Sequence, residues 1–194
     1  IDASKADYLH ALGVTDAAGK VYKSAQDKYK QINHYIELLS TALKQLSKDK
    51  TLQVADMGSG KGYLTFALAD YMTNTLAQQV AVKGVEYRQD MVELCNEIAQ
   101  EAAMPYLSFE QNTIQDYVAS AGIDVLIALH ACDTATDDAL AKGIQHHADL
   151  IVVAPCCHKQ IRRSIEEGKK ETNLDFMLQH GIFLELQSEM LTDS

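Results

Sequence analysis

The chain has 194 residues, of which 47% are hydrophobic and 23% charged, with a formal net charge of −10. This length suits one domain with a full core, and no apolar run approaches the roughly 18 residues of a membrane span. The polar start, Asp2 to Asp7, does not resemble a signal peptide. Four cysteines, two of them adjacent, form no disulfide framework, so we expect a cytoplasmic protein without membrane association.

The acidic excess by itself disfavours a nucleic-acid partner, but it is unevenly distributed. Residues 1–53 carry eight lysines and six acidic residues, whereas residues 54–150 carry four basic and fourteen acidic ones. The basic residues gather in two clusters: Lys20, Lys23, Lys28 and Lys30, and Lys159, Arg162 and Arg163. Solvated lysines and a patch that follows a phosphate backbone are equally good interpretations.

Apolar periodicity predicts a long helix over 24–46, with one apolar face formed by Ile32, Tyr35, Ile36, Leu39, Leu43 and Leu46. Strands are predicted at 52–56, 80–86, 107–110, 124–129 and 149–154. Helices are predicted between them: one through Tyr71, one that carries Met91, Leu94, Cys95 and Ile98 and ends before Pro105, and one over 134–146. Two further helices are predicted over 159–168 and 174–191.

Strands that alternate with helices predict an α/β fold with a mainly parallel sheet, helices on both faces, and ligands at the carboxyl ends of the strands. We expect residues 1–50 to form a helical segment that caps the cleft, and residues 51–194 to form the ligand-binding domain. Nothing after Ala154 resembles a strand more than a helix. The two antiparallel strands that often close such a sheet are therefore expected to be absent, and the chain to be truncated.

A glycine at every second position follows the first predicted strand, in Asp56-Met57-Gly58-Ser59-Gly60-Lys61-Gly62. Such a turn lets the backbone approach a ligand where a Cβ would collide with it. A Walker loop is excluded, because Lys61 is followed by glycine rather than Ser or Thr. A dinucleotide loop fits poorly, because the third glycine comes one residue early and Asp56 would repel a phosphate.

A ligand with a positive charge suits this loop better. S-adenosylmethionine carries an ammonium and a sulfonium but no phosphate, and its ribose diol needs a carboxylate at the end of the second strand. Glu86 ends that strand. The sequence therefore predicts an S-adenosylmethionine site; the alternative is a tight strand-to-helix turn without a ligand.

Two further clusters end the fourth and fifth strands: Leu129-His130-Ala131-Cys132-Asp133-Thr134 and Pro155-Cys156-Cys157-His158-Lys159. His130 could act as a general base, and a cysteine activated by His158 as a nucleophile. Asp133 or Thr134 could instead cap the next helix. The ligand types would suit zinc, but the spacing matches no closed structural site, so no metal is expected. Small residues that merely shape a pocket are the remaining alternative.

Together these motifs resemble one group of class I methyltransferase domains. The group includes the domain of the glutathione S-transferase C-terminal-domain-containing protein and, more distantly, eukaryotic tRNA ribose 2′-O-methylases with their His-x-Cys-Gly, Thr-Asp and Cys-Cys motifs. The resemblance covers about residues 28–163 and includes Thr136-Asp137. Gln31 and Asn33, in a Lys-x-x-Gln-x-Asn pattern, also resemble a segment of this group. Asp133 departs from it, because the tRNA enzymes have glycine there.

The resemblance implies a Rossmann-like fold, S-adenosylmethionine as cofactor and RNA as a possible substrate. Together with the loop, it assigns cofactor binding to Asp56, Gly58, Ser59, Gly60, Gly62, Glu86, Tyr87, Thr113, Ile114 and Leu129. Thr113 and Ile114 match the pair that lies against the adenine. Catalytic roles are predicted for His130, Asp133 and Cys156, and substrate contacts for Cys157, His158 and Lys159.

We therefore predict an S-adenosylmethionine-dependent methyltransferase that acts on RNA, either tRNA or rRNA. One alternative is a methyltransferase for a protein or small molecule, which an acidic chain without a clear basic groove would suit better. Another is a non-catalytic cofactor-binding module of a larger protein. The sequence does not determine the methylated atom or the oligomeric state.

Overall fold

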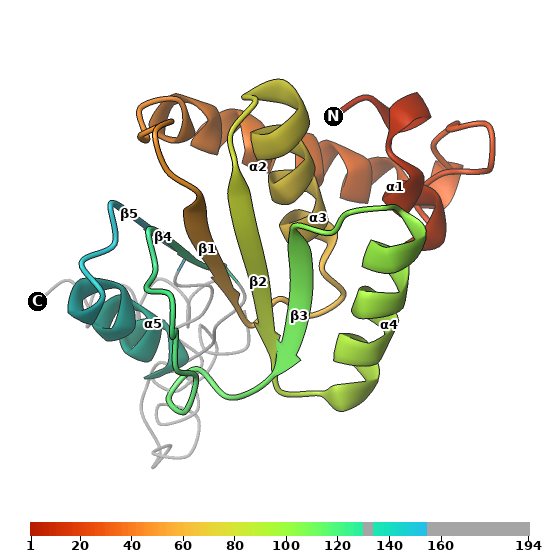
Figure 1. Cartoon of the computed structure of the whole chain (residues 1–194). Coiled ribbons are helices and arrows are strands. Elements are labelled where there is room, and N and C mark those ends of the chain that lie inside the picture. The colour runs from red at the N-terminus through yellow and green to blue at the C-terminus, as the bar shows by residue number, and fades with distance from the viewer. Residues whose placement is uncertain (130–133, 155–194) are drawn as a thin grey trace, which may run out of the picture.

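The computed structural model describes residues 1–129 and 134–154. Its centre is a five-stranded, fully parallel sheet in the order β3-β2-β1-β4-β5 (Figure 1). The strands are β1 (Leu52–Met57), β2 (Val80–Glu86), β3 (Leu107–Gln111), β4 (Val125–Ala128) and β5 (Leu150–Val153). The predicted α/β class with a parallel sheet is confirmed.

Successive residues of the central strands point to opposite faces of the sheet, and both faces are covered. On β1, Val54 belongs to the larger apolar cluster and Ala55 to the smaller one. On β4, Ile127 and Leu126 divide in the same way. Burial on both faces explains why β4 is a continuous run of apolar residues rather than an alternating pattern.

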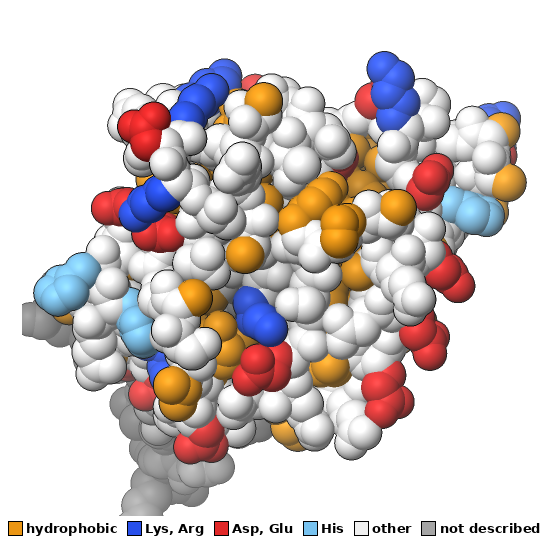
Figure 2. Space-filling model, viewed as in Figure 1, with side chains coloured by type: hydrophobic (Ala, Val, Ile, Leu, Met, Phe, Trp, Pro, Cys, Tyr) orange, Lys and Arg blue, Asp and Glu red, His pale blue; other side chains and the backbone are white. Residues whose placement is uncertain are grey.

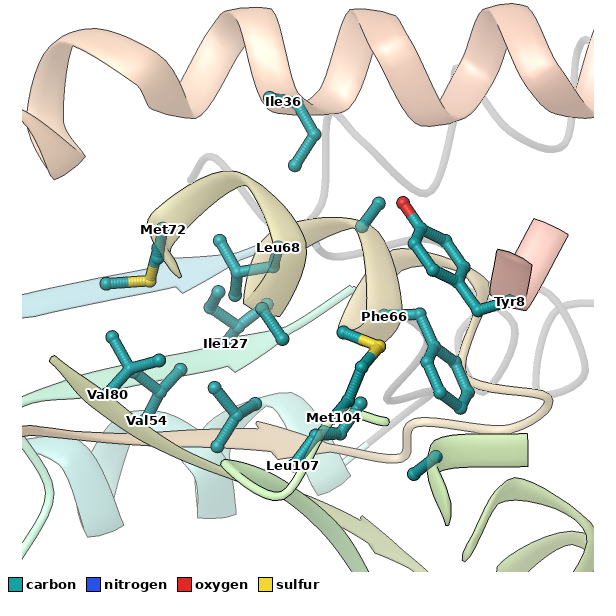
Figure 3. Packing of buried hydrophobic residues seen from close by; sticks show 14 of the residues in the cluster. Tyr8, Ile36, Val54, Phe66, Leu68, Met72, Val80, Met104, Leu107 and Ile127 are labelled. Carbon is teal, nitrogen blue, oxygen red and sulfur yellow. The ribbon is translucent and has the colours of Figure 1, made fainter. Parts of the chain in front are cut away.

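Three helices cover the first face: α2 (Gln26–Leu43), α3 (Tyr63–Asp70) and α4 (Gln89–Glu101). Helix α3 lies between the sheet and α2, and Ile36 of α2 points toward it (Figure 3). The short α1 (Asp7–Ala11) adds Tyr8, whose ring stacks on Phe66 of α3 with the centroids 5.6 Å apart. Helix α5 (Thr134–Gln145) packs on the second face against β4 and β5.

Strand β1 leads into α3 on the first face, whereas β4 leads toward α5 on the second. Because β1 and β4 are neighbours, the connections after them diverge at the carboxyl edge of the sheet. Ligands of open α/β sheets bind at such a switch point. The topology therefore places a binding crevice beside the glycine loop that follows β1.

The predicted strands agree with the structure to within one residue at each end, and the helices show small differences. Helix α2 is shorter than predicted, and α3 is followed by a π-helical turn over Tyr71–Thr75. Short helical segments also precede α2, at Ala3–Lys5, in α1 and at Lys23–Ala25. On α4 the buried residues are Val92, Cys95, Ile98 and Ala99. Leu94 is 38% exposed, because it lies at the border of the side that packs against β3.

The predicted helices at 159–168 and 174–191 lie outside the described residues, and so does the region of the expected missing strands. One apolar cluster joins residues of the 1–50 range to the sheet; the division at residue 50 stays a prediction. Within residues 1–129 and 134–154, no helix combines the length and the hydropathy that crossing a membrane would require.

Gly84 of β2 allows close packing against Phe109, which gives a first prediction. A Cβ there would lie 2.3 Å from Cδ1 of Phe109 and 3.0 Å from Oγ of Ser59. We expect Gly84→Ala to lower the free energy of unfolding by about 1–3 kcal/mol, because the buried ring must move. Urea denaturation measures this, and adding Phe109→Leu should restore part of the loss. A more stable Gly84→Ala, the ordinary result in a strand, would contradict the packing.

Candidate cofactor site

The turn after β1 has a backbone that glycine adopts far more readily than other residues. Gly58, Gly60 and Gly62 have φ values of 74°, 56° and 70°, all in the left-handed region. The amides of Gly58 and Ser59 both donate to the carbonyl of Val85, at 2.8 and 3.1 Å. These bonds hold the loop against the end of β2, so the loop and the β2 carboxyl end form one rigid edge.

A cavity of about 190 Å³ lies on the α2 side of this loop; we call it the Asp56 cavity. Five of the residues predicted to bind the cofactor line it: Asp56, Gly58, Ser59, Gly60 and Leu129. The rest of its lining comes from α2, the loop and the first turn of α3: Lys28, Gln31, Lys61, Tyr63 and Leu64. The walls combine one buried carboxylate with lysines at the rim.

A second cavity, of about 470 Å³, lies on the other side of the loop; we call it the Glu86 cavity. It shares Gly58 and Gly60 with the Asp56 cavity. Its other lining residues include the four predicted ones, Glu86, Tyr87, Thr113 and Ile114, together with Val85, Arg88, Asn112, Gln115 and Ala135. One glycine loop thus separates two cavities, each with its own carboxylate.

Asp56 is one of two buried carboxylates of the site; like Glu86, it has 7% of its surface exposed. Burial raises the pKa of its carboxyl group to about 7, although a 2.5 Å hydrogen bond donated by Thr65 Oγ1 acts in the opposite direction. No cation pairs with it among the described residues. A cationic ligand group in the Asp56 cavity would supply the missing countercharge.

Glu86 is held in place by three donors. Its Oε2 accepts the amide of Gly60 at 2.8 Å, and its Oε1 accepts both the amide and Nε of Arg88 at 3.1 Å. The carboxylate therefore bridges the glycine loop and the residue that follows β2. This position fits the diol-binding carboxylate that the sequence predicts, because the group borders the Glu86 cavity beside the loop.

The remaining residues predicted to bind the cofactor differ in their surroundings. Tyr87 is 69% exposed and forms an open wall of the Glu86 cavity. The Ser59 hydroxyl is buried and has no hydrogen-bond partner within residues 1–129 and 134–154. Gly62 lines neither cavity; a Cβ there would lie 3.0 Å from the rings of Phe109 and Phe66, so this glycine allows close packing behind the loop.

The predicted catalytic residues His130, Asp133 and Cys156 lie outside the described residues, as do Cys157, His158 and Lys159. The strands that lead to them are described. Ala128 is paired with Val153, and the amide of Ala154 donates to the carbonyl of Ala128 at 3.1 Å. The two strands therefore end side by side at the edge that carries the glycine loop.

Lys28 and Gln31 of α2 were not predicted to line the site, yet both border the Asp56 cavity. The Lys-x-x-Gln-x-Asn pattern could have indicated that these residues line the site, but exposed positions on a helix explain the same residues equally well. Arg88 was also missed, although it directly follows the predicted cofactor residues Glu86 and Tyr87. As for metals, residues 1–129 and 134–154 contain no group of three or more His, Cys, Asp or Glu side chains able to hold an ion.

A family model described as a methyltransferase domain matches residues 27–164, which is most of the chain. The chain therefore belongs to this family of methyltransferase domains. This match confirms the predicted methyltransferase domain, and the five-stranded parallel sheet confirms the Rossmann-like fold expected of it. No curated protein sequence matches the chain.

Among solved structures, the chain is similar to magnesium protoporphyrin IX methyltransferase from Synechocystis PCC 6803 with bound S-adenosylhomocysteine. The two share 17% identity over 88% of this chain and 83% of that one, with a TM-score of 0.52. A candidate RNA methyltransferase from Pyrococcus horikoshii matches at 22% identity over 70% and 66% of the two chains, with a TM-score of 0.49. The first likeness shows the fold alone. The chain spans only 27–38% of several longer matching structures.

The raised pKa of Asp56 gives a prediction for the ligand-free protein. Because its folded pKa of about 7 exceeds the usual 3.8, the folded state holds a proton that the unfolded state releases, so this group's contribution to stability falls as pH rises from about 4 to 7. Asp56→Asn removes this pH-dependent contribution to stability. Relative to wild type, we expect the variant to gain about 2–4 kcal/mol between pH 4 and pH 8 in chemical denaturation.

Asp124→Asn provides a control of opposite sign. Burial alone would raise the pKa of Asp124, but the amide of Gln53 and the ammonium of Lys50 lower it overall. Its contribution to stability is therefore present at neutral pH and lost on acidification, so its removal should destabilise the protein most above pH 4. If Asp56→Asn behaved like Asp124→Asn, Asp56 would be charged in the folded protein.

Proposed function

We propose that S-adenosylmethionine lies across the glycine loop, with its adenosine in the Glu86 cavity and its methionine in the Asp56 cavity. The observation that carries this proposal is the pair of cavities that share Gly58 and Gly60 and hold one carboxylate each. Glu86 would accept hydrogen bonds from the ribose diol, and Tyr87 and Ile114 would border the adenine. Asp56 would pair with the ammonium.

The bound cofactor supplies a methyl group on a sulfonium, which a substrate nucleophile takes in a single displacement. The residues of this chain orient that step and exclude water. The buried Asp56 and Glu86 fix the two ends of the ligand, so the reacting centre would lie over the shared glycines, near Leu129. We infer that His130, which follows Leu129 in the sequence, accepts the proton of the nucleophile, and that Asp133 and Cys156 have the other catalytic roles that the sequence predicts.

RNA is the substrate that we propose for this site. The first support is the resemblance of the His-x-Cys and Cys-Cys motifs to those of tRNA ribose methylases. The second is position: Lys28 borders the Asp56 cavity, and Lys20, Lys23 and Lys30 lie within eight residues of it. Lysines beside the methyl donor would contact phosphates of a nucleic acid that presents its nucleotide there.

One observation favours a protein or small-molecule substrate instead. Exposed acidic residues line α4 (Asp90, Glu93, Glu97 and Glu101), a helix without a single lysine or arginine, and red side chains gather along that side in Figure 2. This flank would repel a polyanion. An RNA substrate would therefore have to approach from the side of α2.

The cofactor assignment predicts a loss of affinity in Glu86→Gln. This variant replaces the carboxylate that accepts a hydrogen bond from the Gly60 amide and would accept hydrogen bonds from the ribose diol. The dissociation constant for S-adenosylhomocysteine should therefore rise about tenfold or more in titration calorimetry. Glu110→Gln is the matched control, because Glu110 pairs with Lys83 and lines neither cavity. Equal affinity in wild type and Glu86→Gln, or no binding to either, would refute the assignment.

The RNA assignment predicts that Lys23→Gln/Lys30→Gln weakens retention of total tRNA and makes its salt dependence less steep, because two phosphate contacts are lost. Lys44→Gln/Lys48→Gln makes the same charge change beyond the other end of α2, whose 18 residues span about 27 Å. Filter binding at several salt concentrations measures both. If the two pairs behave alike, or wild type retains no RNA, the alternative substrates gain support.

A further inference from the structure

The Asp56 cavity has an electrostatic requirement that Asp56 cannot meet. The methionine end of the proposed cofactor carries a carboxylate as well as an ammonium. Asp56 attracts the ammonium but repels the carboxylate, so the same end of the site needs a group that attracts an anion, and a cationic side chain does this most strongly. We propose that Lys28 of α2 binds this carboxylate and so makes the N-terminal helix part of the cofactor site. This inference rests on the proposed function.

Lys28 is already held at the rim of the cavity. Its Nζ donates to Oε1 of Gln31 at 2.9 Å and lies 5.3 Å from the ring centroid of Tyr63. Both partners line the same cavity, Gln31 from α2 and Tyr63 from the start of α3. A lysine with its ammonium fixed by a ring and an amide loses less conformational freedom when a ligand arrives than a free one does.

The other cations near the site are less suited. Within the described part of the chain, Lys61 is the only other cation that lines the Asp56 cavity, and it takes part in no hydrogen bond, ion pair or ring contact. Arg88 lines only the Glu86 cavity and donates to Glu86. Lys28 therefore combines the right cavity, the right charge and a fixed position.

This role also accounts for the two different environments along α2. Its buried residues, such as Ile36 and Leu39, pack into the core. Lys28 and Gln31, roughly one and a half to three turns earlier, are exposed and line the cavity. Packing of the helix against the core thus determines where Lys28 lies relative to the glycine loop, and Gln31 acts as a positioning residue for Lys28.

Two ligands that differ only in the carboxylate test the proposal: S-adenosylhomocysteine and its decarboxylated form, S-adenosyl-3-thiopropylamine, which keeps the ammonium. We expect Lys28→Met to weaken binding of the first by about three- to tenfold in titration calorimetry and to leave the second unchanged. Lys28→Arg, which keeps the charge, should retain most of the preference for the carboxylate. Lys44→Met, an exposed lysine directly after α2 that lines neither cavity, is the matched control and should change neither affinity.

Three outcomes would overturn the proposal: unchanged affinity in Lys28→Met, an equal loss for both ligands, or loss of the preference in Lys61→Met instead. In the first case the amides of the first turn of α3 would bind the carboxylate, and in the second Lys28 would act only through the structure of the rim. A wild-type protein that binds neither ligand would instead refute the cofactor site itself, so the two failures are distinguishable.

Discussion

The attachment of the glycine loop to strand β2 is the constraint on which the rest of the site depends. Gly58 and Ser59 donate their amides to Val85, and Glu86 accepts the amide of Gly60. These bonds require a left-handed backbone, which glycine adopts without steric cost. Because the loop lies flat on the end of β2, it leaves open space on both sides, and the two cavities follow from that geometry.

The two carboxylates differ because their surroundings differ. Asp56 is buried, and its partner among the described residues is the Thr65 hydroxyl, so burial raises the pKa of its carboxyl group toward neutrality. Glu86 meets two amides and the Arg88 side chain. Asp56 therefore lacks a countercharge among the described residues, whereas both oxygens of Glu86 already accept hydrogen bonds. A ligand with an ammonium at one end and a neutral diol at the other complements this asymmetry.

Helix α2 connects stability to binding. Its buried face joins α3 to the large apolar cluster (Figure 3), while Lys28 on its exposed side borders the Asp56 cavity. A helix that both completes the core and contributes to the rim cannot move without altering the site. The fold therefore places the N-terminal region and the glycine loop in one structural unit, although about 30 residues separate them in sequence.

The sequence by itself determined the parallel α/β fold, the glycine loop and the acids at the ends of β1 and β2, because strand periodicity and a left-handed turn depend on neighbouring residues. It did not decide which apolar residues of α4 are buried: Leu94 is 38% exposed and Val92 is buried, because only packing against the rest of the fold selects the buried side. Only the tertiary structure showed that Lys28 meets the same cavity as Asp56, that Gly62 supports packing, and that one loop divides two cavities. These facts depend on how α2, α3 and β2 pack together, and packing between distant segments leaves no local pattern in the sequence.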